Sequence, residues 1–174
     1  LTVLPPLTVR WQVFAVDLRG HGLSARVPGA YRVADYAGDV TDFVKRLPGG
    51  PVVLVGHSLG GNVAAAVAAA LPERVGALVL EDPLLGMAGP RLSETYFPEM
   101  FRAFRRFAGS NAPVSEIAAE LAGTRLPVPG RDAPVPLGEI RDRVSLWVSA
   151  SGLRHLDPEV LDPPLSGRWL AGSA

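Results

Sequence analysis

The sequence has no cysteine, only three histidines and no net charge over its 174 residues. Without cysteine it can form neither disulfides nor thiolate metal sites, and it has no thiol nucleophile. Three histidines are few for a histidine metal cage, so we expect no metal and no cofactor. The 17 basic residues are balanced by 17 acidic ones, which leaves no positive footprint for polyphosphate, and we expect no nucleic-acid partner.

Long uninterrupted apolar runs are also missing. The longest stretch without a charge, residues 47–72, is broken by glycine, proline and polar residues, and we expect no stable membrane span. The first residues show no basic segment followed by an apolar one, as a secretory signal would, so we expect a cytoplasmic protein. The missing initiator methionine leaves open a natural chain that begins earlier.

Short apolar runs alternate with helical patterns in the first half of the chain. The runs predict strands buried on both faces, and the apolar spacing between them predicts two helices. Strands joined through helices pair in parallel by right-handed crossovers, so the fold class is α/β, a parallel sheet with flanking helices. The predicted strands are 13–16, 52–55 and 77–80, and the predicted helices are 33–47 and 59–71.

The pattern changes near Leu84, after which no buried strand run of that quality follows. Helical spacing predicts helices over 97–108, 115–121 and 140–148, with an irregular proline-rich joint at 127–136 and a short segment from Leu156. We therefore expect two parts, an α/β portion over residues 1–83 and a helical region over residues 84–174.

The pattern Gly56-His57-Ser58-Leu59-Gly60 lies directly between a predicted strand and a predicted helix. In that setting the serine lies on a sharp turn that lifts its hydroxyl clear of the sheet, and a side chain at either glycine is expected to collide across the turn. The Leu59 N–H, first in the helix, points to where negative charge develops when a carbonyl is attacked. The alternative is a glycine-rich turn in which Ser58 only caps the helix.

Together with the upstream run Asp17-Leu18-Arg19-Gly20-His21-Gly22-Leu23-Ser24, the GHSLGG motif after VVLV resembles the α/β-hydrolase superfamily of esterases, lipases and haloperoxidase-like enzymes. The resemblance covers residues 11–83 well. It implies that Ser58 is the nucleophile, that the Leu59 amide is an oxyanion donor, and that the substrate is a small apolar ester-like or carbonyl compound. Residues 84–170 are similar in a general way to the helical cap of this family.

The resemblance also implies an acid and a histidine base after the nucleophile. His155 is the one histidine that follows Ser58, and Asp82 lies at a predicted strand end where it could orient a base. The family's additional strands, second oxyanion amide and later acid are not recognisable, so a chain truncated at both ends is the economical interpretation. A compact triad of Ser58, Asp82 and His155, and a non-catalytic small-molecule binder or inactive relative, are the alternatives.

The upstream loop also fits G-x-G-x-x-A, a dinucleotide-binding pattern. That interpretation requires a helix that opens at the third position and an acidic residue at a strand end. Instead Arg26-Val27-Pro28-Gly29 continues a loop, and Asp39 falls on a predicted helix. We therefore favour a structural turn in which Asp17 binds local amides.

The predicted helix 97–108 carries aromatic side chains at helical spacing, with arginines opposite. This pattern is typical of a lid over an apolar pocket, and equally of packing inside a cap. A helix lying on a membrane surface is a weaker alternative because the chain is neutral overall.

Overall fold

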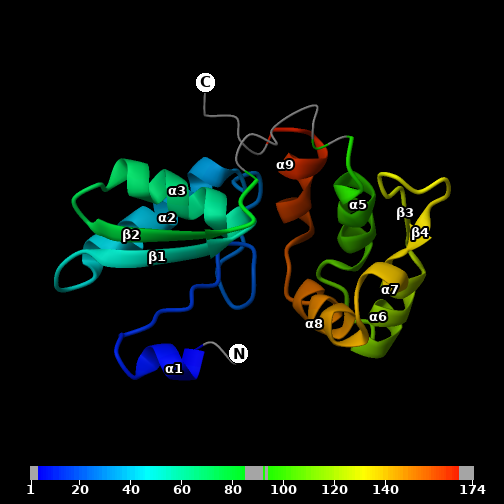
Figure 1. Ribbon diagram of the computed structural model, residues 1–174, viewed down its shortest axis with the longest axis horizontal. Coiled ribbons are helices and arrows are strands. Elements are labelled where there is room, and N and C mark those ends of the chain that lie inside the picture. Colours follow the sequence, from blue (N-terminus) through cyan, green and yellow to red (C-terminus); the bar gives the residue numbers. More distant parts are fainter. Residues whose placement is uncertain (1–3, 85–91, 93, 169–174) are drawn as a thin grey trace.

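A computed structural model describes residues 4–84, 92 and 94–168 of the chain (Figure 1). The first part contains α1 (Leu4–Thr8), α2 (Val33–Arg46), β1 (Val52–His57), α3 (Leu59–Ala70) and β2 (Val75–Glu81). The second part contains α5 (Phe97–Phe107), α6 (Val114–Gly123), β3 (Arg125–Leu126), β4 (Val135–Pro136), α7 (Leu137–Ile140), α8 (Arg143–Leu153), η1 (Pro158–Leu161) and α9 (Asp162–Leu165).

Two of the three predicted strands form a parallel pair. β1 and β2 align from Val53 opposite Ala77 to His57 opposite Glu81, and α3 connects them as the crossover helix. Both predicted helices are confirmed, since α2 covers 33–46 and α3 covers 59–70. The chain therefore has the α/β fold class expected from its alternating pattern, a parallel sheet with flanking helices.

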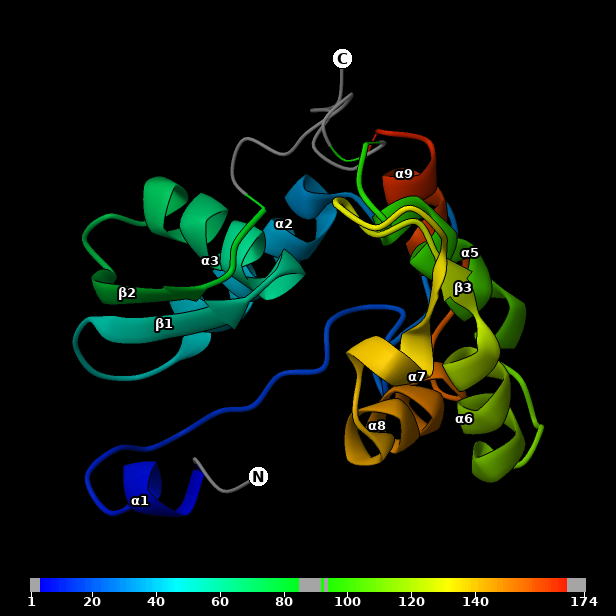
Figure 2. The same ribbon diagram turned by 45° about the vertical axis from the view of Figure 1, so that its right-hand side comes forward.

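The predicted strand over residues 13–16 is wrong. This segment runs extended past the sheet, but it makes no ladder hydrogen bond with any described residue (Figure 2). The Phe14 ring instead packs edge-on against Phe43 of α2, with the ring centroids 5.5 Å apart. An apolar run with strand propensity becomes a strand only where a neighbouring backbone pairs with it.

Full burial of the two remaining strands was also a wrong expectation. α3 packs on both strands and α2 packs on α3, so one face of the pair is covered. The opposite face is open in the described part of the chain, where Val53 is 41% exposed and Val55 is 69% exposed. β2 likewise exposes Val79. Strands that consist of apolar residues throughout indicate burial on both faces only if both faces have a covering layer.

One arginine holds the covering helix to the sheet. Arg74, just before β2, donates hydrogen bonds to the carbonyl oxygens of Val44 and Leu47 at the end of α2, and to Gly49 and Gly50 in the following turn. The last carbonyls of a helix have no partner within it, and a cationic donor there satisfies them. Arg74 therefore fixes where α2 ends relative to the start of β2.

Helices dominate the second part, as predicted. The predicted helices 97–108 and 115–121 correspond to α5 and α6, and the segment after Leu156 forms η1 and α9. The third predicted helix is displaced, because Asp142 accepts the N–H groups of Val144 and Ser145 and so starts α8 at residue 143 rather than 140. No described helix is both long and apolar enough to cross a membrane.

A buried joint connects the two parts of the chain. The Tyr31 hydroxyl donates to Asp157 Oδ2 at 2.6 Å and accepts the Val27 N–H at 2.8 Å. The Asp157 N–H donates to the carbonyl oxygen of Gly20 at 2.7 Å. Tyr31 is 2% exposed and Asp157 7% exposed, so water does not compete for these hydrogen bonds. The buried apolar residues of both parts form one continuous cluster around this joint.

We predict that Tyr31→Phe lowers the free energy of unfolding by about 2 kcal/mol, because it leaves Oδ2 of the buried Asp157 carboxylate without its donor, while Oδ1 keeps the Glu159 N–H. Urea denaturation measures the loss. Tyr96→Phe removes a hydroxyl outside this joint and is the control. Equal effects of the two substitutions would contradict the special role of Tyr31.

The same variant changes the alkaline dependence of stability. Burial, followed by the hydrogen bond with Asp157, raises the pKa of Tyr31 above its ordinary value of 10.0. Above pH 10 the unfolded chain ionises first, so this contribution is present below that pH and is lost as the pH rises further. Tyr31→Phe should therefore lose less stability than the unsubstituted protein above pH 10.

Candidate active site

Ser58 has an unusual backbone conformation. This residue joins β1 to α3 with φ 51° and ψ −116°, and its N–H donates to the Glu81 carbonyl oxygen at the end of β2, at 2.9 Å. Asp82, with φ 43°, is the other non-glycine residue at positive φ among those described. Such conformations cost on the order of 1–3 kcal/mol and persist where the surroundings impose them, most often at functional sites.

Of the two glycines that flank Ser58 in the motif, only Gly56 is required by close contacts in the turn. A Cβ at Gly56 would lie 2.2 Å from the Gly60 carbonyl oxygen, so only glycine fits there. A Cβ at Gly60 meets nothing within 4 Å, and the expected collision at that position is wrong. Close approach instead involves the next residue, Gly61, whose added Cβ would lie 3.0 Å from the Pro83 Cβ. The first turn of α3 therefore packs directly on the ends of the two strands.

Ser58 does not serve as a side-chain cap of α3. Its carbonyl oxygen accepts the N–H groups of Gly61 and Asn62, at 3.0 and 3.2 Å, but its hydroxyl makes no capping hydrogen bond. The serine is half-buried. The simple capping interpretation of this serine therefore does not describe the turn.

Leu59 is the first residue of α3, and its N–H has no acceptor among the described backbone carbonyls. The first N–H groups of a helix lack partners within it, and the helix dipole adds positive potential at the same end. This amide is thus available for an oxyanion that forms beside Ser58. Among the described residues, the Leu59 N–H is the one backbone amide that we identify as an oxyanion donor beside Ser58.

Ser58 and Asp82 are neighbours, because each directly follows one residue of the paired couple His57 and Glu81. His155 lies elsewhere, exposed in the turn between α8 and η1. It lines a cavity of about 560 Å³ that Asp17 and His21 also line and that does not include Ser58. Hydrogen bonds that would unite Ser58, Asp82 and His155 are absent from the described part of the chain.

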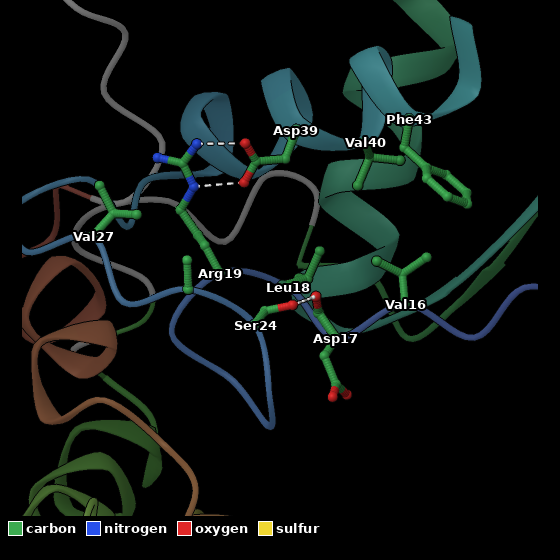
Figure 3. A pocket seen from close by; sticks show the side chains of 10 residues that line it. Val16, Asp17, Leu18, Arg19, Ser24, Val27, Asp39, Val40 and Phe43 are labelled. Atoms are coloured by element: carbon green, nitrogen blue, oxygen red, sulfur yellow. Dashed lines mark hydrogen bonds and ion pairs between the residues drawn. The ribbon is translucent and has the colours of Figure 1, made fainter. Parts of the chain in front are cut away.

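The loop after the extended segment is a structural turn. Asp17 Oδ2 accepts the Leu23 N–H at 3.3 Å and the Asp17 carbonyl oxygen accepts the Ser24 hydroxyl at 2.6 Å, which confirms the expected binding of a local amide (Figure 3). A Cβ at Gly22 would lie 2.1 Å from Asp17 Oδ2, so this position also needs glycine. A cavity of about 310 Å³ lies between this loop and α2.

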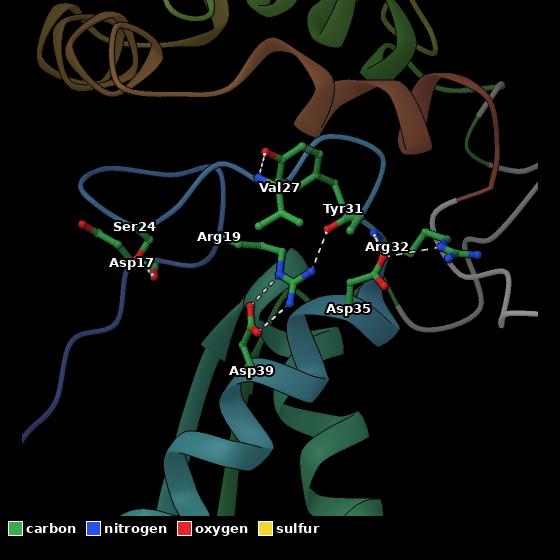
Figure 4. A network of polar contacts seen from close by, with 9 residues as sticks. Asp17, Arg19, Ser24, Val27, Tyr31, Arg32, Asp35 and Asp39 are labelled. Carbon is green, nitrogen blue, oxygen red and sulfur yellow. Dashed lines mark hydrogen bonds and ion pairs between the residues drawn. The ribbon is translucent and has the colours of Figure 1, made fainter.

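An ion pair argues further against dinucleotide binding at this loop. Arg19 donates to both carboxylate oxygens of Asp39, each at 2.6 Å, so that carboxylate is engaged within the protein (Figure 4). These hydrogen bonds hold the pKa of Asp39 below its ordinary value. No helix starts at the glycines, because the loop continues to residue 32. The pattern at 20–25 is therefore part of the turn that joins the extended segment to α2.

A model of the alpha/beta hydrolase fold family matches residues 2–119. Over 76 residues the chain is 41% identical to a 2-(acetamidomethylene)succinate hydrolase of Mesorhizobium japonicum, which covers 44% of this chain and 27% of that relative. Over 91 residues it is 42% identical to lipase LipV of Mycobacterium tuberculosis, which covers 47% and 31%. The structure of a hydrolase from Pseudomonas aeruginosa PA01 superimposes with a TM-score of 0.62 at 25% identity, over 95% of this chain and 57% of that one.

The chain belongs to the α/β-hydrolase family. The family match covers more than half of its residues and includes both the turn at Asp17 and the junction at Ser58. The two curated relatives are named a hydrolase and a lipase. The chain spans about a quarter to a third of those relatives' length in the matched stretches.

We predict opposite outcomes for alanine at the two motif glycines. Gly56→Ala places a methyl group against backbone that cannot move aside, and should lower the free energy of unfolding by about 3 kcal/mol or more. Gly60→Ala meets open space within a helix, where alanine is favoured over glycine by up to about 1 kcal/mol. Chemical denaturation compares the two. Similar losses at both positions would contradict the one-sided contact.

Proposed function

We propose that this chain carries the nucleophile of a serine hydrolase that acts on a small apolar ester or similar carbonyl compound. The observation that carries the proposal is the backbone of Ser58, strained at the junction of β1 and α3 with its hydroxyl free of any capping bond. A strand, a strained serine and a helix in this order are typical of a nucleophile elbow. The hydrolase and lipase relatives agree with this assignment.

In the proposed reaction the Ser58 oxygen attacks the substrate carbonyl and forms a tetrahedral oxyanion. The Leu59 N–H donates to that oxyanion, aided by the positive end of the α3 dipole. Collapse of the intermediate expels the alcohol or amine and leaves an acyl-serine, which water then hydrolyses to release the acid and free Ser58. The serine proton must pass to a base and on to the leaving group.

We propose that His155 is not this base. It is exposed and lies on a cavity that does not include Ser58, and no described hydrogen bond connects the two residues. Asp82 adjoins Ser58 at the strand ends and can orient a base that approaches there. The compact triad of Ser58, Asp82 and His155 is the competing assignment, and it requires the turn after α8 to move to the elbow.

We propose a separate role for each part of the chain. Residues 1–83 form the catalytic portion, and residues 84–174 form a helical cap. In the proposed cap, Phe104 of α5 lines the 560 Å³ cavity, which does not include Ser58. Phe97, Phe101 and Phe107 pack half-buried against the apolar cluster, which is the packing role. Phe104 packs against the same cluster, so these contacts favour the packing role, and a lid over the substrate pocket stays a proposal.

A non-catalytic binder of small molecules is the second candidate function. It is favoured by one observation, namely that no described histidine is hydrogen-bonded to Ser58. A serine hydroxyl without a base is a weak nucleophile, so the two candidates differ in how fast Ser58 reacts.

We predict that a fluorophosphonate probe labels the chain at Ser58 and that Ser58→Ala abolishes this labelling. Intact mass and peptide mapping locate the adduct. Ser110→Ala, at a turn outside the elbow, is the matched control and should be labelled as the unsubstituted chain is. Labelling that persists in Ser58→Ala would remove the assignment of the nucleophile, and labelling no faster than that of a peptide serine would favour the binder.

A second prediction concerns the base. His155→Ala should change the rate of p-nitrophenyl acetate hydrolysis by less than twofold, because the imidazole does not contact Ser58. A drop of 100-fold or more, the size typical of a lost general base, would establish the compact triad instead. Circular dichroism before and after the substitution verifies that both proteins are folded.

A further inference from the structure

The 560 Å³ cavity at His155 is separate from the Ser58 junction and has the size of a small-molecule site. One wall comes from the loop after the extended segment and the other from the end of α8 and the turn that follows it. Phe104 of α5 also lines the cavity. The lining residues are Asp17, His21, Gly22, Leu23, Phe104, Ser149, Ser151, Gly152, Leu153, His155 and Leu156.

Both walls are fixed by the buried joint. Gly20, which precedes His21 directly, accepts the Asp157 N–H at 2.7 Å, and Asp157 follows His155 by two residues. The Tyr31 hydroxyl holds the Asp157 side chain from the other direction. His21 on one wall and His155 on the other are 134 residues apart in the sequence. The hydrogen bond between Asp157 and Gly20 nevertheless holds the two walls next to each other. The residues on both sides of the cavity are therefore held by the same joint, and such restraint reduces the entropic cost of binding.

The hydrogen bond of the His21 ring indicates which of its two nitrogens carries the hydrogen in the neutral form. Its Nδ1 lies 2.9 Å from the carbonyl oxygen of Arg19, and since a carbonyl oxygen only accepts, Nδ1 carries the proton. In the neutral ring Nε2 then keeps its lone pair and is an acceptor. The ring is also held edge-on to Tyr36, with the centroids 6.1 Å apart. Thus a side chain that lines the cavity has a fixed tautomer and one acceptor left for a ligand.

The remaining lining selects the charge of the ligand. Asp17 contributes a carboxylate, and no lysine or arginine is among the described residues that line the cavity, so an anion is disfavoured. Leu23, Leu153 and Leu156, with Phe104, supply apolar surface. The hydroxyls of the two lining serines can both donate and accept. A ligand that suits this lining is apolar and uncharged, and carries an O–H group.

We propose that this cavity is a second binding site, which takes a small uncharged apolar alcohol whose O–H donates to His21 Nε2. The site does not involve Ser58, and its occupancy is independent of whether Ser58 reacts. Because such ligands are small, the dissociation constant is on the order of millimolar.

The three histidines of the chain make the test direct, since His21 and His155 line the cavity and His57 lies outside it. Imidazole resonances in ¹H–¹³C spectra are followed while benzyl alcohol is added to the full chain and, in parallel, to Ser58→Ala. We expect saturable shifts at His21 and His155, none at His57, and the same affinity in both proteins. Benzoate, the anionic counterpart, should bind at least tenfold more weakly.

Two variants locate the contact. His21→Phe keeps an aromatic ring against Tyr36 but removes the acceptor, and should weaken benzyl alcohol binding at least fivefold, read from His155. Ser151→Leu, at an exposed position on the cavity wall, places a larger apolar side chain in the cavity and should abolish binding. Equal shifts at all three histidines, no saturable shift at His21 or His155, benzoate binding as tight as the alcohol, or unchanged affinity in either folded variant would overturn the proposal. Fluorophosphonate labelling of Ser58 bears on the proposed function alone.

Discussion

The arrangement of the whole chain depends on a hydrogen-bonded joint at Asp157. Its N–H reaches the carbonyl oxygen of Gly20 and its carboxylate accepts the Tyr31 hydroxyl, all within a buried setting. A Cβ at Gly20 would lie 2.5 Å from the Val160 side chain, so the close approach needs glycine as well as the hydrogen bonds. The joint acts together with the continuous apolar cluster and with the hydrogen bond from the Gly29 N–H to Glu159 Oε2 to fix the helical part against the α/β part. The joint also sets the walls of the cavity at His21.

A second constraint operates at the carboxyl ends of the two strands. Gly56 and Gly61 let α3 pack directly against the strand ends, and Ser58 absorbs the resulting change of direction in a left-handed conformation. The hydrogen bond from Ser58 to Glu81 ties the turn to β2. Strain at Ser58 is thus maintained by contacts on both sides, which is the condition under which a distorted residue can persist.

The sequence predicted the local backbone features at the candidate site. The junction at Ser58, the first amide of α3 and the turn at Asp17 each depend on a few consecutive residues, and the structure contains each of them. The collision expected at Gly60 was wrong because the two glycines of the motif face different surroundings, backbone at Gly56 and open space at Gly60. No periodicity indicates which neighbours a small residue will have. The sequence likewise indicated His21 only as part of a turn. Its place in a cavity could not be predicted, because the other lining residues lie far along the chain.

The sequence by itself determined helices α2, α3, α5 and α6 and the two paired strands, because apolar spacing and glycine or proline stops act over a few residues. Only the tertiary structure decided that residues 13–16 stay unpaired and that Val53 and Val55 are exposed, since pairing and burial require a neighbour that the local pattern does not specify. It likewise decided that Asp157 meets Gly20 and Tyr31. These contacts join residues more than 120 positions apart, and such contacts form only when the packing of the whole chain brings their partners together.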